Sequence, residues 1–456
     1  MKRIRTFGVT AVIAAAALLL AGCSGDAGSA TPAGNGAPPA SSVAGSTAPS
    51  TSSTAGSATA PITVTDPTAD TQQGTDASDP ATSSSVQTTR TTTTKPKPKS
   101  ATVTASPAFG TDELNPLDPM KLTVKGGKIA TLAVYAEDGS KIAGKLSADR
   151  TGWTSDQRLR YGGTYHAKGT ATGAPGSATT KIDGIWTTFD PPTQTTRISP
   201  GDGALVGVAA PIIIRFGACI ADHADVEKHV TVTTDPKVTL RGTWIQHDGD
   251  QCRSLDLRPA DFWPEGTKVH VSVDLLGIEV SDGLYGARET ATSDFTIGRN
   301  RVTYANPQDK RLIVKEDGKV VADYPTSMGS GDDVGDPHRV TRSGIHVVTG
   351  KEADKKMTSE RYHYKDLPEP WAVRISNNGE FIHQNMETID VQGIQNVSHG
   401  CLNLSDVNAK AYFEKAMYGD PVVITGTSVQ LGPSDGDIYD WAIPFSEWHS
   451  LNTASS

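Results

Sequence analysis

Alternating apolar and polar positions dominate the chain from about residue 109 to residue 299. Short alternating runs at residues 129–135 and 141–146 flank Asp138-Gly139, and Asp-Gly between two such runs is typical of a β-hairpin. This pattern predicts two immunoglobulin-like β-sandwiches, one over residues 109–190 and one over residues 191–299. Neither segment gathers titratable residues into a plausible site, so we expect both to act as spacers or docking modules.

The pattern changes after residue 300, where short strands are joined by a helix. Residues 311–322 and 371–383 each predict a hairpin with a glycine in its turn. A helix is predicted to begin after Ser405 as its N-cap and to end at Gly419. We therefore expect a third, β-rich domain over residues 300–426, with one short helix, and a fold class that is mainly β.

Two segments lie outside these domains. Residues 427–456 carry Trp441 and Trp448, large rings that we expect to pack back against an earlier domain. Residues 23–108 consist largely of Ser, Thr, Ala, Gly, Pro and Asp, without an aromatic residue or a leucine. Such a segment buries too little apolar area to offset its ordering entropy, so it predicts a disordered tether with a root-mean-square reach of about 50 Å.

The first residues have the pattern of an export signal. Three basic residues precede an apolar run at residues 9–20, which is short for a membrane-spanning helix. The sequence Leu20-Ala-Gly-Cys23 then resembles a bacterial lipobox. This resemblance implies that residues 1–22 are removed and that Cys23 carries the lipid, which places the protein on the outer face of the cell membrane. The alternative is an ordinary secretory signal in which Cys23 has no role.

Composition narrows the possible partners. Only 36% of the residues are hydrophobic and the chain holds 45 Gly and 28 Pro, as expected for strands and turns beside an unstructured part. The formal net charge is −9, which favours solubility and leaves no large basic surface for a nucleic acid.

Four cysteines divide by context. Cys23 belongs to the lipobox and Cys401 to a His-Gly-Cys motif, so Cys219 and Cys252 remain as a pair in one strand-rich segment. An exported protein favours a disulfide between them, and two buried free thiols are the alternative.

The chemistry is concentrated in His383 and the segment Ser398-His-Gly-Cys-Leu-Asn403. A thiol with a reference pKa near 8.5 needs a base or a positive environment to act as a nucleophile at neutral pH. His383, at the end of a predicted strand, can supply that base to Cys401. Gly400 lets the backbone approach a ligand closely, so the amides of Gly400 and Cys401 are candidate donors to an oxyanion.

This motif resembles the signature of the L,D-transpeptidases, and the order of segments is similar to that of the mycobacterial members. The resemblance implies that Cys401 is the nucleophile and His383 the base, oriented by the backbone carbonyl of Gln384. It also implies that Ser398, His399, Gly400 and Asn403 shape the site. The substrates would be peptidoglycan peptide stems, joined through their diaminopimelate residues with release of D-alanine. No cofactor is implied, and β-lactams of the carbapenem type would be covalent inhibitors.

One departure and several alternatives remain open. The family often has Thr-Pro-x-Gly where this chain has Thr341-Arg-Ser-Gly344. Hydrolysis of the thioester would make the protein an L,D-carboxypeptidase, an inactive domain would leave a wall-binding lipoprotein, and His and Cys side chains also ligate zinc. The charged stretch at residues 351–370 is a candidate lid. We expect His338, His346 and His363 to be surface or loop residues.

Overall fold

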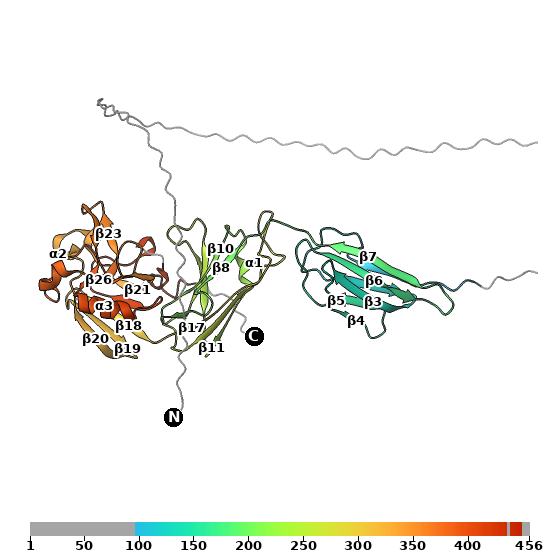
Figure 1. Ribbon diagram of the computed structural model, residues 1–456, viewed down its shortest axis with the longest axis horizontal. Helices are drawn as coiled ribbons and strands as arrows, with labels where there is room; N and C mark the ends of the chain where they lie inside the picture. Colours follow the sequence, from blue (N-terminus) through green and yellow to red (C-terminus); the bar gives the residue numbers. More distant parts are fainter. Residues whose placement is uncertain (1–95, 436–437, 449–456) are drawn as a thin grey trace, which may run out of the picture. The chain divides into compact units, whose positions relative to one another are not determined.

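The computed structural model describes residues 96–435 and 438–448 of the chain. The predicted signal peptide, Cys23 and most of the predicted tether therefore lie outside the described residues. Among the described residues, no helix combines the length and the apolar composition needed to cross a membrane. Strands predominate in all the domains, as the sequence predicted, and Figure 1 shows them as arrows with few helices between them.

The first sandwich consists of a four-stranded and a three-stranded sheet. The larger sheet has the order β1-β2-β5-β4 and the smaller one β3-β6-β7. Trp186 of β7 is fully buried in the core, and its indole Nε1 donates to the carbonyl of Pro107 at 2.8 Å. The strands are β1 (Thr102–Ser106), β2 (Lys121–Lys125), β3 (Lys128–Ala136), β4 (Gly144–Leu146), β5 (Gly152–Ser155), β6 (Thr164–Thr172) and β7 (Thr180–Thr187).

The predicted end of the tether at residue 108 is wrong, because β1 lies within it. Thr102 to Ser106 pair residue by residue with Lys125 to Lys121 of β2. Val103 and Ala105 are half-buried against the core of the sandwich. The strand contains only Thr, Val, Ala and Ser, so its composition does not differ from that of the tether, and only its pairing with β2 distinguishes it.

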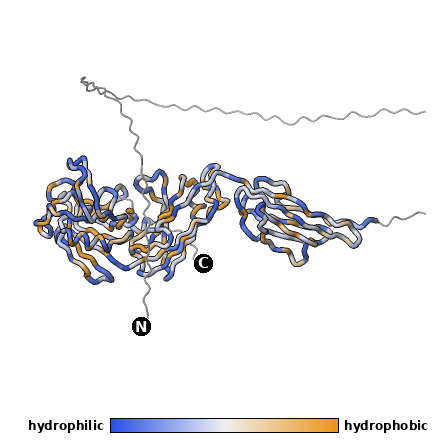
Figure 2. The backbone as a smooth tube through the Cα atoms, viewed as in Figure 1, coloured by the Kyte–Doolittle hydropathy of each residue, from blue (hydrophilic) through white to orange (hydrophobic). Residues whose placement is uncertain are grey.

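The second sandwich pairs the sheet β12-β13-β10-β8 with the sheet β11-β14-β17-β9. Val269, Val271 and Val273 of β14 all face its core. Figure 2 shows hydrophobic and hydrophilic stretches interleaved along the backbone of this domain. The elements are β8 (Thr196–Ser199), β9 (Leu205–Val206), β10 (Ile212–Phe216), α1 (His223–Glu227), β11 (Val230–Asp235), β12 (Arg241–Ile245), β13 (Ser254–Arg258), β14 (Lys268–Val273), β15 (Glu279–Ser281), β16 (Leu284–Tyr285) and β17 (Ala291–Ile297).

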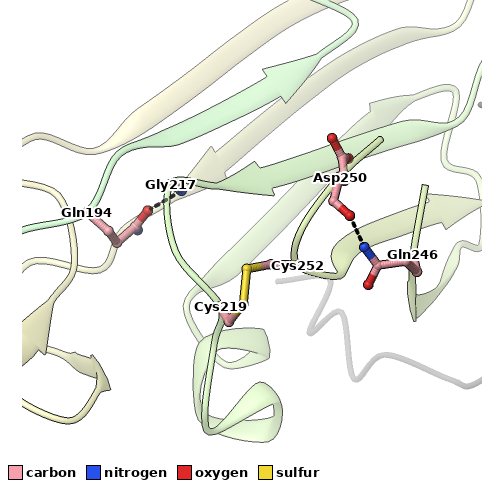
Figure 3. The surroundings of a disulfide bond; sticks show 6 residues. All are labelled: Gln194, Gly217, Cys219, Gln246, Asp250 and Cys252. Carbon is pink, nitrogen blue, oxygen red and sulfur yellow. Dashed lines mark hydrogen bonds between the residues drawn. A yellow bond between two sulfur atoms is a disulfide. The ribbon is translucent and has the colours of Figure 1, made fainter. Parts of the chain in front are cut away.

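A disulfide joins Cys219 and Cys252 in this sandwich, as Figure 3 shows. Cys219 lies between β10 and α1, and Cys252 lies between β12 and β13. The loop that carries Cys252 is also fastened by Gln246, whose side-chain amide donates to the carbonyl of Asp250. The bond therefore connects two loops that follow strands of the same sheet.

The third domain is built on two sheets that share one core. One sheet has the order β20-β19-β18-β28-β21 and the other β22-β25-β26-β27, with a separate hairpin β23–β24. Leu312 and Val422 from the first sheet and Ile382 and Leu402 from the second belong to the same buried cluster, together with Tyr412. The strands are β18 (Arg301–Asn306), β19 (Arg311–Glu316), β20 (Lys319–Pro325), β21 (Gly344–Val347), β22 (Gly350–Glu352), β23 (Lys356–Ser359), β24 (Tyr364–Pro368), β25 (Ala372–Arg374), β26 (Phe381–Gln384), β27 (Leu402–Leu404) and β28 (Pro421–Ile424).

The predicted helix is α3 (Asp406–Lys415), and both predicted hairpins, β19–β20 and β25–β26, are present. Ser405 is its N-cap, with Oγ accepting from the amide of Asn408 at 3.3 Å. The helix ends at Lys415, four residues before the predicted stop at Gly419. Gly419 is instead required by a close approach, because a Cβ there would lie 2.6 Å from the Cβ of Ala210.

This approach connects the second sandwich to the third domain through the backbone. The amide of Gly207 donates to the carbonyl of Tyr418 at 2.8 Å, and that of Ala209 donates to Gly419 at 2.9 Å. The C-terminal segment adds to the contact, since the indole of Trp441 donates to the carbonyl of Ala209 at 2.8 Å.

The second C-terminal tryptophan lies against the same sandwich. The indole of Trp448 donates to the carbonyl of Arg241 at 2.8 Å. The buried guanidinium of Arg258 lies 4.5 Å from the ring centres of both Trp441 and Trp448. Each stacked pair of this kind contributes about 0.5 to 2 kcal/mol.

Candidate active site

Cys401 lies at the edge of a pocket of about 600 Å³ in the third domain. The β23–β24 hairpin provides one wall, through residues that include Tyr362 and Tyr364. The turn before β26 and its first residue, Phe381, provide another. Cys401 is half-buried, and its Sγ is 3.5 Å from the carbonyl oxygen of Gly379 in that turn. The predicted nucleophile is therefore accessible from a cavity large enough for a peptide.

His383 reaches this site from β26. Ile382 faces the core of the domain, so its neighbours Phe381 and His383 face the opposite side. Phe381 is 4% exposed and lines the pocket. His383 is only 2% exposed and is paired directly with Asn403 of β27. Two adjacent parallel strands thus deliver the histidine and the chain that follows the cysteine.

Three groups determine the state of the His383 ring. Its Nδ1 lies 2.7 Å from the carbonyl oxygen of Gln384, the interaction expected from the sequence, and 2.9 Å from a carboxylate oxygen of Glu369. Burial by itself would lower the pKa of His383, but the hydrogen bond and charge of Cys401, followed by those of Glu369, raise it to about 10. A charged imidazolium beside the sulfur is the positive environment that a nucleophilic cysteine needs.

The Ser398-His-Gly-Cys turn is held by its own side chains. The hydroxyl of Ser398 donates to the carbonyl of Cys401 at 2.6 Å and accepts from the amide of Gly400 at 3.1 Å. Gly400 has a φ of +127°, which a residue with a Cβ rarely adopts. The Gly400 amide is thus occupied, so the prediction that it is free to bind an oxyanion is wrong. Of the two predicted donors, the amide of Cys401 remains.

His399 points to the hairpin rather than to His383. Its ring stacks on Tyr362, with centres 4.0 Å apart, and lies 6.0 Å from Tyr364. Burial, with a further effect from Arg339, lowers the pKa of His399, which favours its neutral form. The hairpin predicted as a lid is therefore attached to the cysteine turn by an aromatic stack.

The segment Thr341-Arg-Ser-Gly344, which departs from the family pattern, forms part of the pocket wall through Arg342. Hydrogen bonds and ion pairs hold this Thr341 wall in place. The hydroxyl of Thr341 donates to the carbonyl of Gly400 at 2.8 Å and accepts from the amide of Gly329 at 2.9 Å. Arg342, where the family often has proline, forms ion pairs with Glu380 at 3.3 Å and Asp435 at 2.7 Å. Thr341 thus holds the cysteine turn directly.

The expectation that His346 is a surface or loop residue is wrong. It is fully buried on β21, where its Nε2 lies 2.8 Å from the carbonyl oxygen of Arg342. Its Nδ1 is 3.6 Å from the carboxylate of Glu380. His346 therefore belongs to the network behind the Thr341 wall, whereas His338 and His363 are exposed as predicted.

Asn403 stabilises the strand beside the histidine. Its side-chain amide donates to the hydroxyl of Thr388 at 3.3 Å, and its backbone exchanges hydrogen bonds with Ser327.

Glu369 was not predicted as a site residue, because it lies in a charged stretch with no motif around it and comes close to His383 only in the folded chain. Among the described residues, no cluster of three or more His, Cys, Asp or Glu side chains is arranged to hold a metal ion.

Comparison with known proteins agrees with this geometry. Residues 300–424 match the L,D-transpeptidase catalytic domain, and residues 111–279 match a bacterial Ig domain. The chain is 41% identical to L,D-transpeptidase 5 of Mycobacterium tuberculosis (strain ATCC 25618 / H37Rv), over 77% of this chain and 76% of that protein. It is 32% identical to L,D-transpeptidase 2 of Mycobacterium tuberculosis (strain CDC 1551 / Oshkosh), over 77% of this chain and 84% of that protein.

A solved structure of the LD transpeptidase LdtMt1 in complex with imipenem covers 51% of this chain and 99% of its own, with 28% identity and a TM-score of 0.43. The two sequence relatives align over most of their own lengths and over most of this chain. The catalytic-domain match includes both Cys401 and His383. The chain therefore belongs to the L,D-transpeptidase family, acyltransferases that use a cysteine nucleophile to cross-link peptidoglycan.

Proposed function

We propose that Cys401 is the nucleophile and that it attacks the carbonyl group of the third residue of a tetrapeptide stem, diaminopimelate. The thiolate adds to the carbonyl carbon, and the C–N bond to the terminal D-alanine breaks. The proton held by His383 moves to the departing amine, so free D-alanine leaves and a thioester remains. The observation that carries the proposal is the buried His383, whose pKa is raised to about 10 beside the accessible Cys401.

The second half-reaction returns the proton. The side-chain amine of a second stem has a reference pKa near that of lysine, about 10.4, and must lose a proton as it attacks. His383, neutral after the first step, accepts that proton, and Cys401 leaves as the thiolate. The product is a cross-link between the third residues of two stems. General base catalysis of this kind typically contributes about 10²- to 10⁴-fold in rate.

The remaining site residues have supporting roles in this proposal. The amide of Cys401 donates to the oxyanion that forms in each step. Ser398 and Gly400 hold the shape of the turn, and Asn403 holds β27 beside the histidine. Lys356, Arg361 and Arg374, which line the pocket, supply positive charge for the carboxylates of a peptide stem.

A single reaction tests the proposal against its nearest alternative. The mature protein is incubated with a purified disaccharide tetrapeptide, and the products are identified by mass. A cross-linked dimer together with free D-alanine is expected. A free tripeptide as the sole product would mean that water, and not an amine, accepts the acyl group, as in a carboxypeptidase. Cys401→Ala is the matched control and loses both products.

We also propose where the enzyme acts. The lipobox-like Leu20-Ala-Gly-Cys23, after a basic start and an apolar run, supports lipid attachment at Cys23 on the outer face of the cell membrane. A lipid anchor with several acyl-chain methylenes, at about 0.8 kcal/mol each, retains a protein at a membrane. The segment of residues 24–95 then separates the anchor from the first sandwich and lets the enzyme reach into the wall. Carbapenems are its expected covalent inhibitors.

A further inference from the structure

Glu369 contacts the Nδ1 side of the His383 imidazole. It directly follows β24 and is 6% exposed. One carboxylate oxygen lies 2.9 Å from Nδ1 of His383, and the other accepts from the side-chain amide of Asn385 at 3.4 Å. A backbone hydrogen bond holds Glu369 in this position, because its amide donates to the carbonyl oxygen of Lys355 at 2.8 Å.

A carboxylate in this position requires a cation. Burying an ionised carboxylate without a partner costs several kcal/mol, so buried carboxylates are normally paired. Among the residues that the structure describes, His383 is the one ion-pair partner that Glu369 has. Lys355 and Arg374 are nearby cations, but each lies over the ring of Phe381, at 5.6 and 4.5 Å.

We infer that Glu369 is a positioning residue that completes a Cys401–His383–Glu369 array and stabilises the charged imidazole between the two half-reactions. The inference rests on the proposed function of Cys401 and His383. The carbonyl of Gln384 orients the ring but carries no net charge, whereas Glu369 adds a full negative charge at a similar distance. When His383 takes the thiol proton, the positive charge of the ring lies directly beside the carboxylate of Glu369.

This array gives the pH profile a predictable direction. The imidazolium is the proton donor to the leaving group, so acylation slows as pH rises through the pKa of His383. The charged groups that act on His383 are Cys401 and Glu369, and both raise its pKa. Tyr364 of β24 lies beside the same two groups, and burial together with the charge of Cys401 raises its own pKa, which keeps it neutral. Removing the charge of Glu369 therefore lowers the pKa of His383. The fall in acylation rate at alkaline pH, which is the alkaline limb of the pH–rate profile, then begins at a lower pH.

Glu369→Gln tests this directly, because glutamine keeps the size and the acceptor oxygen of the side chain while the charge is lost. The rate of covalent addition of a carbapenem is measured against pH for the full mature chain, with adduct mass as the readout. In this addition the thiolate attacks the lactam carbonyl, the ring C–N bond breaks and the imidazolium proton moves to the nitrogen. Since a neighbouring opposite charge typically changes a pKa by about 1 to 3 units, we expect the alkaline limb to move down by about one unit or more.

Glu387→Gln is the matched control, because Glu387 is an exposed carboxylate close by in the sequence that has no place in the site. Its profile is expected to match that of the unchanged protein. An unshifted limb in Glu369→Gln, or an equal shift in Glu387→Gln, would overturn the inference. Failure of the proposed function looks different, because the adduct would then persist in Cys401→Ala.

A spectroscopic measurement on the unchanged protein covers the case in which Glu369→Gln does not fold. With ¹⁵N-labelled histidine, assigned by comparison with His383→Gln, the ring of His383 is expected to remain an imidazolium at pH 8. Glu369→Asp, which keeps the charge, is expected to retain this signal. A neutral ring at pH 8 in the unchanged protein would refute the array.

Discussion

Thr341→Val removes a hydroxyl from behind the cysteine turn while leaving the side-chain volume almost unchanged. Thr341 is 1% exposed, and its Oγ1 links the carbonyl of Gly400 to the amide of Gly329. The substitution leaves a buried acceptor and a half-buried donor without a partner, each at a cost of about 1 to 3 kcal/mol. We therefore expect the free energy of unfolding of the third domain to fall by about 2 to 4 kcal/mol, allowing for partial relaxation.

The same change should also slow acylation, because Gly400 precedes the nucleophile. If only about 1.4 kcal/mol of this loss raises the activation free energy of acylation, the rate falls about tenfold. Calorimetry of the full mature chain measures the stability of the domain, and the rate of carbapenem adduct formation measures the effect on the site.

Thr341→Ser is the matched control, because it restores the hydroxyl and removes one methyl group. It should cost about 1 kcal/mol and leave acylation within a few-fold of the unchanged rate. A Thr341→Val protein as stable as the unchanged one would refute this reasoning. So would equal losses in the valine and serine variants, because the methyl group and not the hydroxyl would then be responsible.

Three further outcomes are expected. Replacing Cys219 and Cys252 by alanine together opens a loop with a sequence separation of 33 residues. The double substitution should destabilise the second sandwich by about 2 to 4 kcal/mol. In the unchanged protein, thiol labelling under denaturing but non-reducing conditions should modify neither cysteine. A carbapenem should add its whole mass once per chain. The Cys401→Ala variant should form no adduct, and the His383→Ala variant should form it slowly. A chelator should have no effect, and a chelator that abolished turnover would contradict the thiol mechanism. Cys23→Ser should release the protein from membranes or leave it uncleaved, and normal retention with normal processing would exclude the proposed anchor.

Local signals in the sequence identified most of the fold. The hairpins β19–β20 and β25–β26 were predicted because glycine-containing turns separate alternating runs, and α3 because Ser405 is a strong N-cap. The first strand was missed because β1 shares its composition with the preceding segment. The stop of α3 was misplaced because Gly419 serves a contact with residue 210, more than 200 positions away.

The candidate site divides in the same way. Cys401, His383 and the carbonyl of Gln384 were predicted because they lie in a short motif with a known resemblance. Glu369 was missed because its role depends on where β24 ends relative to β26. The amide of Gly400 was assigned to an oxyanion because the sequence did not indicate that Ser398 would fold back to occupy it.

The backbone hydrogen bonds between residues 207–209 and residues 418–419 set a limit on how this enzyme can be divided. A chain cut to begin at residue 300 would retain every residue of the pocket, yet the carbonyls of Tyr418 and Gly419 would lose their donors. Trp441 and Trp448 would also lose the guanidinium and the carbonyl oxygens that they contact. The smallest portable unit for engineering, or for inheritance by gene rearrangement, is therefore the second sandwich together with everything that follows it. Hydrogen bonds also join the first sandwich to the second, because the side chains of Asn115 and Tyr161 bond to the backbone of Gly277. Exchanging the first sandwich for a spacer of another length would therefore leave the backbone groups of Gly277 without these partners.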